Sequence, residues 1–324
     1  MSSVAAPNTS LEAVVEVDAR GALEDFWRRF RRDYVALVAA GFIVLVICAA
    51  IIGAPLAAWL TAHPPDRQYV NGLTIDGIPL PPWSHEVGPD GLHANPHGQF
   101  FVLGTDTLGR DVLVRLLYGA RISLFVAFVA TGIALFIGVV LGMLAGYFRG
   151  IGDAFISRAI ETAMAFPALL FAVGFVAVIG AGLANVIIVI TLFSWYYPAR
   201  VVRSAVLSLR EMPFVEAAHM TGASHFRIMF RHLLPQLTAP ITVYATGVIA
   251  ANILFEAGLS YLGLGVPPPT ASWGQMLSNG VGNGLYRVQP WLALIPGITL
   301  ASVMLAFQLL GDGLRDALAT KSAT

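Results

Sequence analysis

Histidine side chains between residues 61 and 100 are the first candidates for chemistry in this sequence. Four histidines occur in that stretch, with two carboxylates close to the last three of them: His63, His85, His93, His97, Glu86 and Asp90. His93 and His97 are four residues apart, a spacing that places two imidazoles on one face of a helix, where they could bind a metal ion. Glycine, proline and asparagine residues around them oppose a helix. We therefore predict an exposed polar loop here and no metal site.

ATP binding and hydrolytic catalysis are excluded by residue types and motifs that the sequence lacks. A phosphate-binding P-loop needs a lysine after its glycines, and the only lysine is Lys321, close to the C-terminus. Neither a G-x-S-x-G nucleophile elbow nor an H-E-x-x-H zinc pair occurs. We therefore expect a chain that is not an enzyme and that holds no cofactor of its own.

Glu256 is an acidic side chain within a strongly apolar stretch of the sequence. A carboxylate near the end of a membrane helix costs a few kcal/mol unless it faces water, a partner or the interior of a helix bundle. Two interpretations follow. Glu256 either lines a substrate pathway near its outer mouth or forms hydrogen bonds to a neighbouring helix inside the bundle.

The elements that must position these residues are membrane helices. The chain is 57% hydrophobic and 12% charged, with a mean hydropathy of +0.74, which is far more apolar than a soluble domain. Its net charge of zero gives no indication of nucleic-acid binding. Six apolar runs approach the roughly 20 residues that cross a bilayer: 35–60, 122–148, 156–181, 183–202, 240–264 and 291–310. We predict an all-α integral membrane protein with six transmembrane helices.

The distribution of basic residues predicts the orientation of these helices. If both termini are cytoplasmic, the cytoplasmic segments hold 14 Arg or Lys residues and the external segments hold 5, as the positive-inside rule requires. The chain then divides into a cytoplasmic tail (1–34), a first transmembrane helix (35–60), an external loop (61–121), a five-helix core (122–310) and a second tail (311–324). Within the external loop, Asp111 and Arg115 have the spacing of a pair on an amphipathic interfacial helix.

A stripe of small residues marks the second span. Ala134, Gly138, Gly142 and Gly146 recur at four-residue intervals, which leaves one face of the helix smooth. Such a face lets another helix backbone approach closely. We therefore assign Gly138, Gly142 and Gly146 to helix packing.

The polar stretch between the fourth and fifth spans has clear signals for two short helices. It covers residues 210–235 and reads REMPFVEAAHMTGASHFRIMFRHLLP. Pro213 and Glu216 suit the start of the first helix, and Gly222 can take the left-handed conformation that ends it. Ser224 can cap the second helix, and Pro235 is expected to end it. A helix-turn-helix in the cytoplasm is predicted, with its histidines on the surface.

This stretch resembles the EAA loop of binding-protein-dependent ABC importer permeases. The matching residues are Glu216, Ala217, Ala218, Gly222 and Pro235. In that family the loop is a coupling helix that sits in a groove of the nucleotide-binding subunit. The resemblance implies the same role here, with the two small alanines allowing close docking and the glycine setting the bend.

Three further stretches resemble the C-type permease subunit of dipeptide, oligopeptide and nickel importers. They are LGTDTLGRDVLVRLLYGARISL (103–124), NILFEAGLSYLGLGVPPP (252–269) with the nearby ASWG (271–274), and GDGLRDAL (311–318). Together with the EAA loop they extend the similarity over residues 104–318, about two thirds of the chain, with gaps between the motifs.

The resemblance implies a type I ABC importer permease fold in the bacterial inner membrane. The partners that it implies are a homologous B-type permease, two ATPase subunits that bind ATP and Mg, an external solute-binding protein, membrane lipid and a peptide substrate. ATP binding would draw paired coupling helices together and switch the shared cavity from inward-open to outward-open. Nickel complexes, antimicrobial peptides or other small solutes are alternative substrates. A membrane scaffold or channel without an ATPase is the alternative from another class.

Overall fold

The computed structural model describes residues 22–318. The outer parts of both predicted tails, residues 1–21 and 319–324 with Lys321, lie outside the described residues. The elements in chain order are α1 (Ala22–Phe30), α2 (Tyr34–Cys48), a π-helical segment (Ala49–Gly53), α3 (Ala54–Thr61), a 3₁₀ segment (Val70–Gly72), β1 (Ser84–His85), β2 (Phe100–Phe101), α4 (Val112–Phe148), α5 (Ile151–Ala165), α6 (Ala168–Ile179), α7 (Leu183–Leu192), α8 (Tyr196–Leu209), α9 (Pro213–Met220), α10 (His225–Arg227), a π-helical segment (Ile228–Leu233), α11 (Leu234–Tyr261), α12 (Trp273–Val281), a 3₁₀ segment (Gly282–Arg287) and α13 (Trp291–Leu318).

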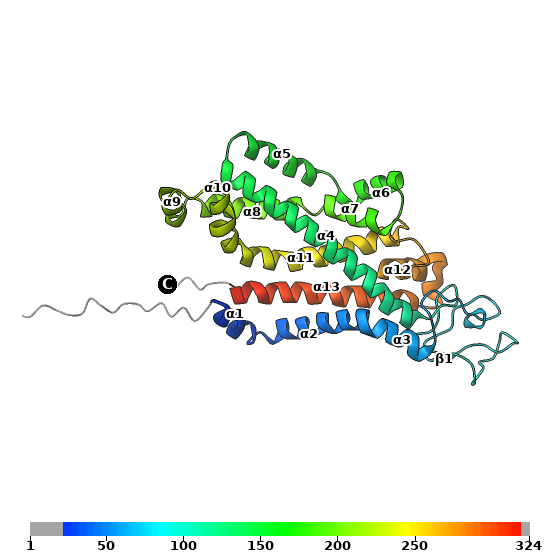
Figure 1. Cartoon of the computed structure of the whole chain (residues 1–324). Helices are drawn as coiled ribbons and strands as arrows, with labels where there is room; N and C mark the ends of the chain where they lie inside the picture. The colour runs from blue at the N-terminus through cyan, green and yellow to red at the C-terminus, as the bar shows by residue number, and fades with distance from the viewer. Residues whose placement is uncertain (1–21, 319–324) are drawn as a thin grey trace, which may run out of the picture.

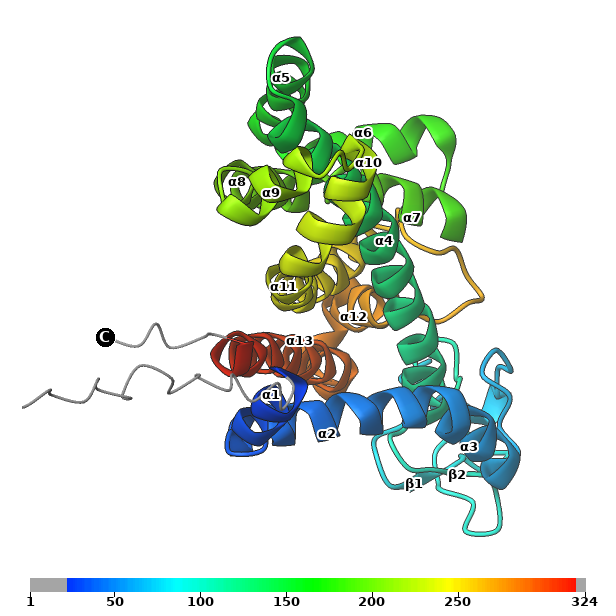
Figure 2. The same ribbon diagram turned by 60° about the vertical axis from the view of Figure 1, so that its left-hand side comes forward.

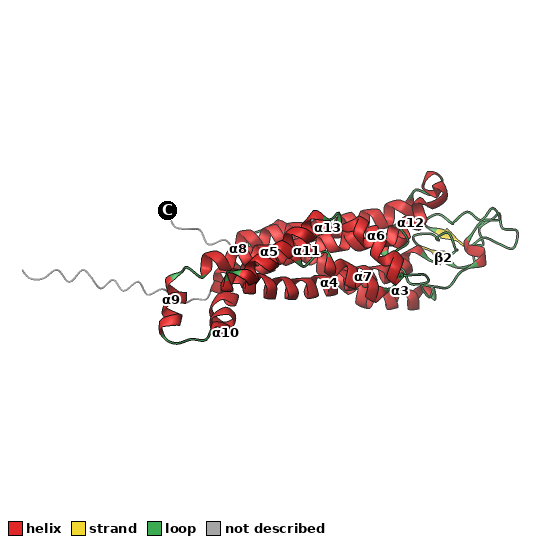
Figure 3. Cartoon of the chain, turned by 90° about the horizontal axis from the view of Figure 1, so that it is seen from above, coloured by secondary structure: helices red, strands yellow, loops and turns green. Residues whose placement is uncertain are grey.

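Five helical stretches within residues 22–318 are long and apolar enough to cross a membrane. They are Tyr34–Thr61, Val112–Phe148, Leu183–Leu209, His225–Tyr261 and Trp291–Leu318. Each overlaps one predicted span. The helices form an elongated bundle, with α9 and α10 at one end and the short β-strands at the other (Figures 1 and 3).

The remaining predicted span, 156–181, is not one helix. It corresponds to α5 and α6, which are bent by 89° at the break between them. Phe166 at the break is extended (φ −87°, ψ 135°) because a following proline, here Pro167, disfavours the helical conformation. The prediction of one continuous helix is therefore wrong here. The pair is a broken span or a re-entrant loop, so the chain has five or six candidate spans.

The small-residue stripe of α4 packs against α8. A Cβ atom added at Gly138 would lie 2.7 Å from the carbonyl oxygen of Trp195, and one added at Gly142 would lie 2.5 Å from that of Ala199. At Gly146 it would lie 2.7 Å from Val206 Cβ. The two backbones thus approach as closely as these glycines allow. In the turned view, α4 crosses the middle of the bundle, while α5 and the α1–α2 pair lie on opposite sides (Figure 2).

Residues 62–111 form a small folded unit at the end of the bundle away from α9 (Figure 1). Strands β1 and β2 pair in antiparallel fashion, with Ser84 opposite Phe101. A small apolar core of four side chains holds the unit together: Tyr69, Leu80, Val87 and Phe101. Burial of these side chains explains how a connection of this length folds without long strands or helices.

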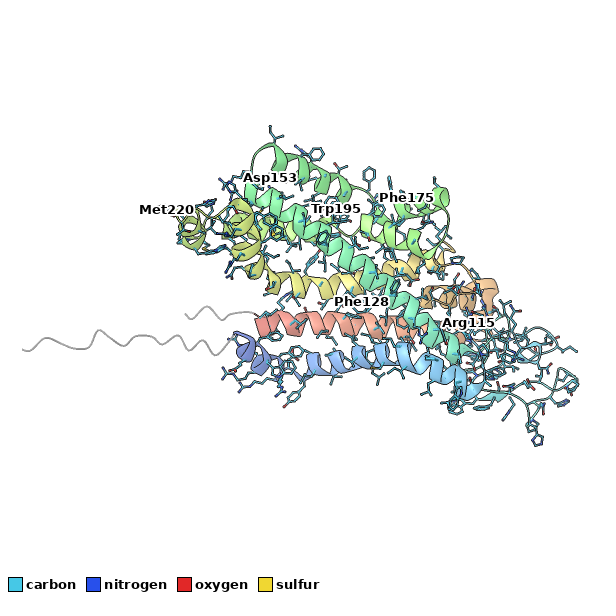
Figure 4. The ribbon with its side chains drawn as sticks, in the orientation of Figure 1. Arg115, Phe128, Asp153, Phe175, Trp195 and Met220 are labelled. Carbon is cyan, nitrogen blue, oxygen red and sulfur yellow. The ribbon has the colours of Figure 1, made fainter. Side chains whose placement is uncertain are left out.

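No separate interfacial helix precedes the second span. Asp111 caps α4, accepting a hydrogen bond from the Val114 N–H at 3.1 Å, and the helix then runs unbroken for 37 residues. Arg115 lies in its first turns with only 1% of its surface exposed, beside the folded unit of residues 62–111 (Figure 4). It pairs with Asp106 and Asp66, both at 3.3 Å, and not with Asp111. Both the interfacial helix and the predicted pair are therefore corrected.

Asp111 pairs with His63, which is 1% exposed. The Nδ1 atom of His63 lies 2.6 Å from Asp111 Oδ2, and its Nε2 atom lies 2.6 Å from Gln99 Oε1. The ring also stacks on Phe101 with centroids 4.9 Å apart. The first histidine of the candidate metal group is thus a buried structural residue that joins the unit of residues 62–111 to the start of α4.

The other histidines of this segment show no metal-binding arrangement. Among residues 22–318 no group of three His, Cys, Asp or Glu side chains is placed to hold an ion. His93 lies in an exposed loop and its Nδ1 atom is 2.5 Å from Asp90 Oδ2. Hydrogen bonds from His93 lower the pKa of the Asp90 carboxyl to about 2.

Candidate functional site

The short helix α9 projects beyond the end of the bundle (Figure 3). It begins with Pro213 in the first turn, where a missing N–H costs nothing, and Glu216 lies in that same turn. Gly222 ends it with φ +78°, in the left-handed region, and no atom would contact a Cβ added there. The Ser224 hydroxyl then accepts a hydrogen bond from the Arg227 N–H at 3.4 Å and caps α10. The predicted helix-turn-helix is present with these signals in place.

One face of α9 is fixed to the bundle. Val215 and Ala218 are 2% and 7% exposed and belong to one apolar cluster with Ile228, Met229 and Leu233. Of the two alanines expected to allow close docking, Ala218 packs inside its own chain. Only Ala217 is exposed.

The opposite face of this loop is open and partly apolar. Met220 and Phe226 are 83% and 68% exposed, and Glu216 and Ala217 are exposed beside them on α9. Met220 lies at the outermost tip of the molecule at this end (Figure 4). We call Glu216, Ala217, Met220 and Phe226 the tip surface. A protruding surface with two large exposed apolar side chains is typical of a protein contact.

The base of the loop is held by hydrogen bonds to the end of α4. The Tyr147 hydroxyl lies 2.8 Å from His225 Nδ1 and 3.3 Å from His219 Nε2. Arg210, at the end of α8, donates from Nη1 to the carbonyl oxygens of Gly146 at 3.0 Å and Tyr147 at 3.2 Å. These contacts tie both sides of the loop to one helix end, so a displacement of α9 must move or break them.

The second helix of the loop does not end at Pro235. α10, the π-helical segment and α11 form one helical stretch, His225–Tyr261. In an α-helix the ring of Pro235 would clash with the carbonyl of Arg231. The π-helical segment Ile228–Leu233 immediately precedes the proline, and its wider turns let the helix continue. The second helix of the loop is therefore continuous with the fifth predicted span.

Glu256 lies in the interior of the bundle and not in an open groove. It is 0% exposed and accepts hydrogen bonds from Ser123 at 2.8 Å and Ser260 at 2.6 Å. Ser123 belongs to α4, and its hydroxyl oxygen also accepts the Trp273 N–H of α12 at 3.2 Å. Of the two interpretations left open by the sequence, the structure places this carboxylate at the junction of three helices.

A groove of about 480 Å³ opens between α8, α11 and the end of α13. Its apolar walls carry six polar side chains: Ser194, Tyr196, Tyr197, Tyr244, Asn252 and Arg315. At its inner end Asn252 accepts a hydrogen bond from Ser194 at 2.7 Å and donates one to Thr131 at 2.8 Å. A wall that combines tyrosine and amide groups with one arginine can bind peptide-like or anionic solutes.

Several of these residues were not predicted from the sequence. Tyrosines and an asparagine inside apolar spans were the available signal, because polar groups in membrane helices face the interior or a cavity. The loop histidines were expected at the surface, and the pairing of His219 and His225 through Tyr147 depends on a residue more than 70 positions away.

Comparisons with known families agree with this arrangement. The family described as binding-protein-dependent transport system inner membrane component matches residues 138–323. The family described as N-terminal TM domain of oligopeptide transport permease C matches residues 21–82.

Two relatives and one solved structure are similar over most of their lengths. The glutathione transport system permease protein GsiD of Pectobacterium atrosepticum is 36% identical over 312 residues, which cover 96% of this chain and 95% of that protein. GsiD of Salmonella typhimurium is 41% identical over 302 residues, with coverages of 92% and 90%. A chain of the inward-facing methionine ABC transporter MetNI superposes with a TM-score of 0.52 at 20% identity, covering 63% of this chain and 96% of that one. This last likeness concerns the fold.

Proposed function

The chain belongs to the family of binding-protein-dependent transport system inner membrane components, and on this premise we propose that it forms half of a peptide pathway. Membership makes it a permease subunit of an ABC importer and not a catalytic enzyme. The proposed further roles are coupling to separate ATPase subunits through the tip surface and passage of short peptides along the groove between α8, α11 and α13.

The observation that carries the coupling role is the tip surface on its rigid base. Its exposed side chains protrude from the bundle, while the buried face of α9 and the Tyr147 contacts fix its position. A surface of this kind can transmit a push only if it cannot slide over the bundle, and α9 is fixed by packing as well as by hydrogen bonds. We infer that Glu216, Ala217 and Gly222 belong to the contact with the ATPase, together with Met220 and Phe226.

The helix connections support a path from the tip surface to the groove. α8 leads into α9, and α10 continues through the π-helical segment into α11. These same helices, α8 and α11, form two walls of the groove. A displacement of α9 therefore acts directly on the groove walls, which is what an alternating-access pathway needs.

Peptides are the proposed substrate class. The relatives are named for glutathione transport, and glutathione is a tripeptide with carboxylates. Arg315 and the tyrosine hydroxyls of the groove can pair with peptide carboxylate and amide groups, while the apolar walls accept varied side chains. Nickel complexes or other small solutes remain the alternative. The proposed partners are a homologous B-type permease, two ATPase subunits that bind ATP and Mg, and an external solute-binding protein in the bacterial inner membrane.

The test is co-purification of the tagged chain with its genomic neighbours in mild detergent, combined with uptake of labelled short peptides. Wild type is compared with Met220→Asp, which places a charge in the proposed contact, and with Val288→Asp as a control. Val288 is 63% exposed but follows α12 in the chain, far from α9. An unpaired buried carboxylate costs about 2 kcal/mol or more, so the tip variant should lose most of its bound ATPase.

Three results bear on the proposal. An ATPase that follows the wild type and the control but not Met220→Asp supports the tip surface as the coupling contact. Retention of ATPase and uptake in Met220→Asp would remove that role. A wild-type chain that purifies with no ATPase would instead favour a scaffold or channel. Measuring whether short peptides compete with the uptake of a nickel complex distinguishes the two substrate classes.

A further inference from the structure

The segment from α1 to the start of α2 carries four arginines within five positions: Arg28, Arg29, Arg31 and Arg32. Arg31 and Arg32 are exposed, and neither pairs with a carboxylate of residues 22–318. The Arg31 guanidinium lies 4.9 Å from the ring centre of Trp27, which is itself 47% exposed. Exposed tryptophan and arginine side chains directly before an apolar helix mark the headgroup level of a membrane.

An apolar groove begins directly below this cluster. It has a volume of about 490 Å³ and lies between the first turns of α2 and the facing turns of α13. Tyr34 and Val38, which are 79% and 73% exposed, line it on α2. Leu305 and Leu309 line it on α13, and the hydroxyls of Tyr34 and Ser302 are its polar side-chain groups.

The groove has the length and direction of part of a lipid acyl chain. From Val35 to Phe42 the helix axis rises by about 10 Å, within the roughly 15 Å of hydrocarbon in one leaflet. Tyr34 stands at its upper end, where interfacial tyrosines are found. The arginines lie above the groove and the apolar walls below, which is the order of headgroup and chain in a phospholipid.

Two carboxylates beside this end of the bundle have partners other than Arg31 and Arg32. The Asp33 carboxylate accepts the Ala36 N–H at 3.0 Å and caps α2. Asp312, on the facing end of α13, lies 3.8 Å from Arg315. Arg31 and Arg32 are exposed and add positive charge directly before the first turn of α2.

We propose that this groove and Arg31 and Arg32 form a binding site for an anionic phospholipid. The arginines hold the phosphate group, and the α2–α13 groove holds the upper part of one acyl chain. The site is distinct from the tip surface and from the groove between α8, α11 and α13. The lipid would lie on the outer side of the contact between α2 and α13, whose side chains pack directly against each other.

Native mass spectrometry of the whole complex tests the proposal. The complex is released from nanodiscs that contain equal amounts of phosphatidylglycerol and phosphatidylcholine, and the retained lipids are counted. Three variants are compared with the wild type: Arg31→Gln with Arg32→Gln, the groove-filling Val38→Trp, and the control Arg287→Gln, whose arginine lies beyond α12. Wild type and control should retain phosphatidylglycerol in preference, and the double variant should lose about tenfold of that preference.

Each outcome decides the proposal. Loss of the preference in both the double variant and Val38→Trp supports a site made of charge and groove together. Equal retention of the two lipids by the wild type, which needs no variant to fold, would overturn it. An unchanged preference in Val38→Trp would also overturn it. So would a cross-link between Val38→Cys and the partner permease, because a protein helix would then fill the groove.

Discussion

Replacing Gly142 by alanine tests the packing of α4 on α8 most directly. The new Cβ atom would lie 2.5 Å from the Ala199 carbonyl oxygen and 2.9 Å from Val202 Cβ. A backbone oxygen cannot rotate away as a side chain can, so the two helices must separate. Gly132 on the same helix provides a matched control, since no atom lies within 4 Å of a Cβ added there.

The expected magnitude follows from two opposing terms. Alanine favours a helix over glycine by about 1 kcal/mol, and both variants gain this term. Overpacking a close contact costs about 1–3 kcal/mol, and only Gly142→Ala carries this cost. The difference between the variants therefore isolates the contact. It should appear as a thermal unfolding midpoint roughly 2–6 °C lower for Gly142→Ala than for Gly132→Ala.

The assay is the unfolding midpoint of the purified subunit in detergent, with both variants measured against the wild type at one lipid content. A midpoint for Gly142→Ala equal to or above that of Gly132→Ala would show that the two backbones do not meet at this face. The same preparation can be scored for ATPase retention, because α8 leads into α9 and a wider α4–α8 spacing shifts the tip surface.

Three other predictions concern buried contacts and the helix that carries the coupling loop. Glu256→Leu should unfold at a lower temperature than Glu256→Gln, because the amide still accepts a hydrogen bond from a serine while leucine leaves both hydroxyls without their acceptor, at about 1–3 kcal/mol each. His63→Ala should make residues 62–111 of the purified subunit more sensitive to added protease, because the buried Asp111 carboxylate loses its imidazole partner, whereas the exposed His97→Ala should not. Pro235→Ala removes the clash that the π-helical turns accommodate, so this segment could become α-helical and α10 would rotate by about 100°. Peptide uptake should then fall while the amount of subunit in the membrane stays the same. Unchanged uptake would contradict this account.

Local signals explain what could be predicted from the sequence. The boundaries of α9 and the start of α10 could be predicted because a proline, a glycine and a capping serine act on the residues beside them. These constraints do not depend on the rest of the fold. The five long helical stretches could be located from the lengths of apolar runs, because hydropathy is also a local property of the sequence. The break before Pro167 was also present in the sequence, but hydropathy measures composition and does not register an 89° bend.

Long-range partners explain what was missed. Arg115 and Arg121 lower the local hydropathy, so α4 was predicted to begin ten residues late. In the structure Arg115 is paired with acidic groups of the unit of residues 62–111, and Arg121 donates to carbonyl oxygens of the π-helical segment Ala49–Gly53. His63 likewise finds its partner 48 residues away. No local window contains such pairs, so helix boundaries set by them depend on tertiary structure.

The polar contacts of α11 with α4 have a mechanical consequence. Asn252 and Glu256 bind Thr131 and Ser123 of α4, so they fix one point along the helical stretch His225–Tyr261. From His225 to Asn252 the stretch measures about 40 Å, and from Asn252 to its outer end about 14 Å. If that point serves as a fulcrum, the helix is a lever with arms in a ratio of about three to one. A shift of about 3 Å at His225 would then move the far end of the stretch by about 1 Å in the opposite direction, and the groove lining on α11 from Val243 to Ala251 would move with the long arm.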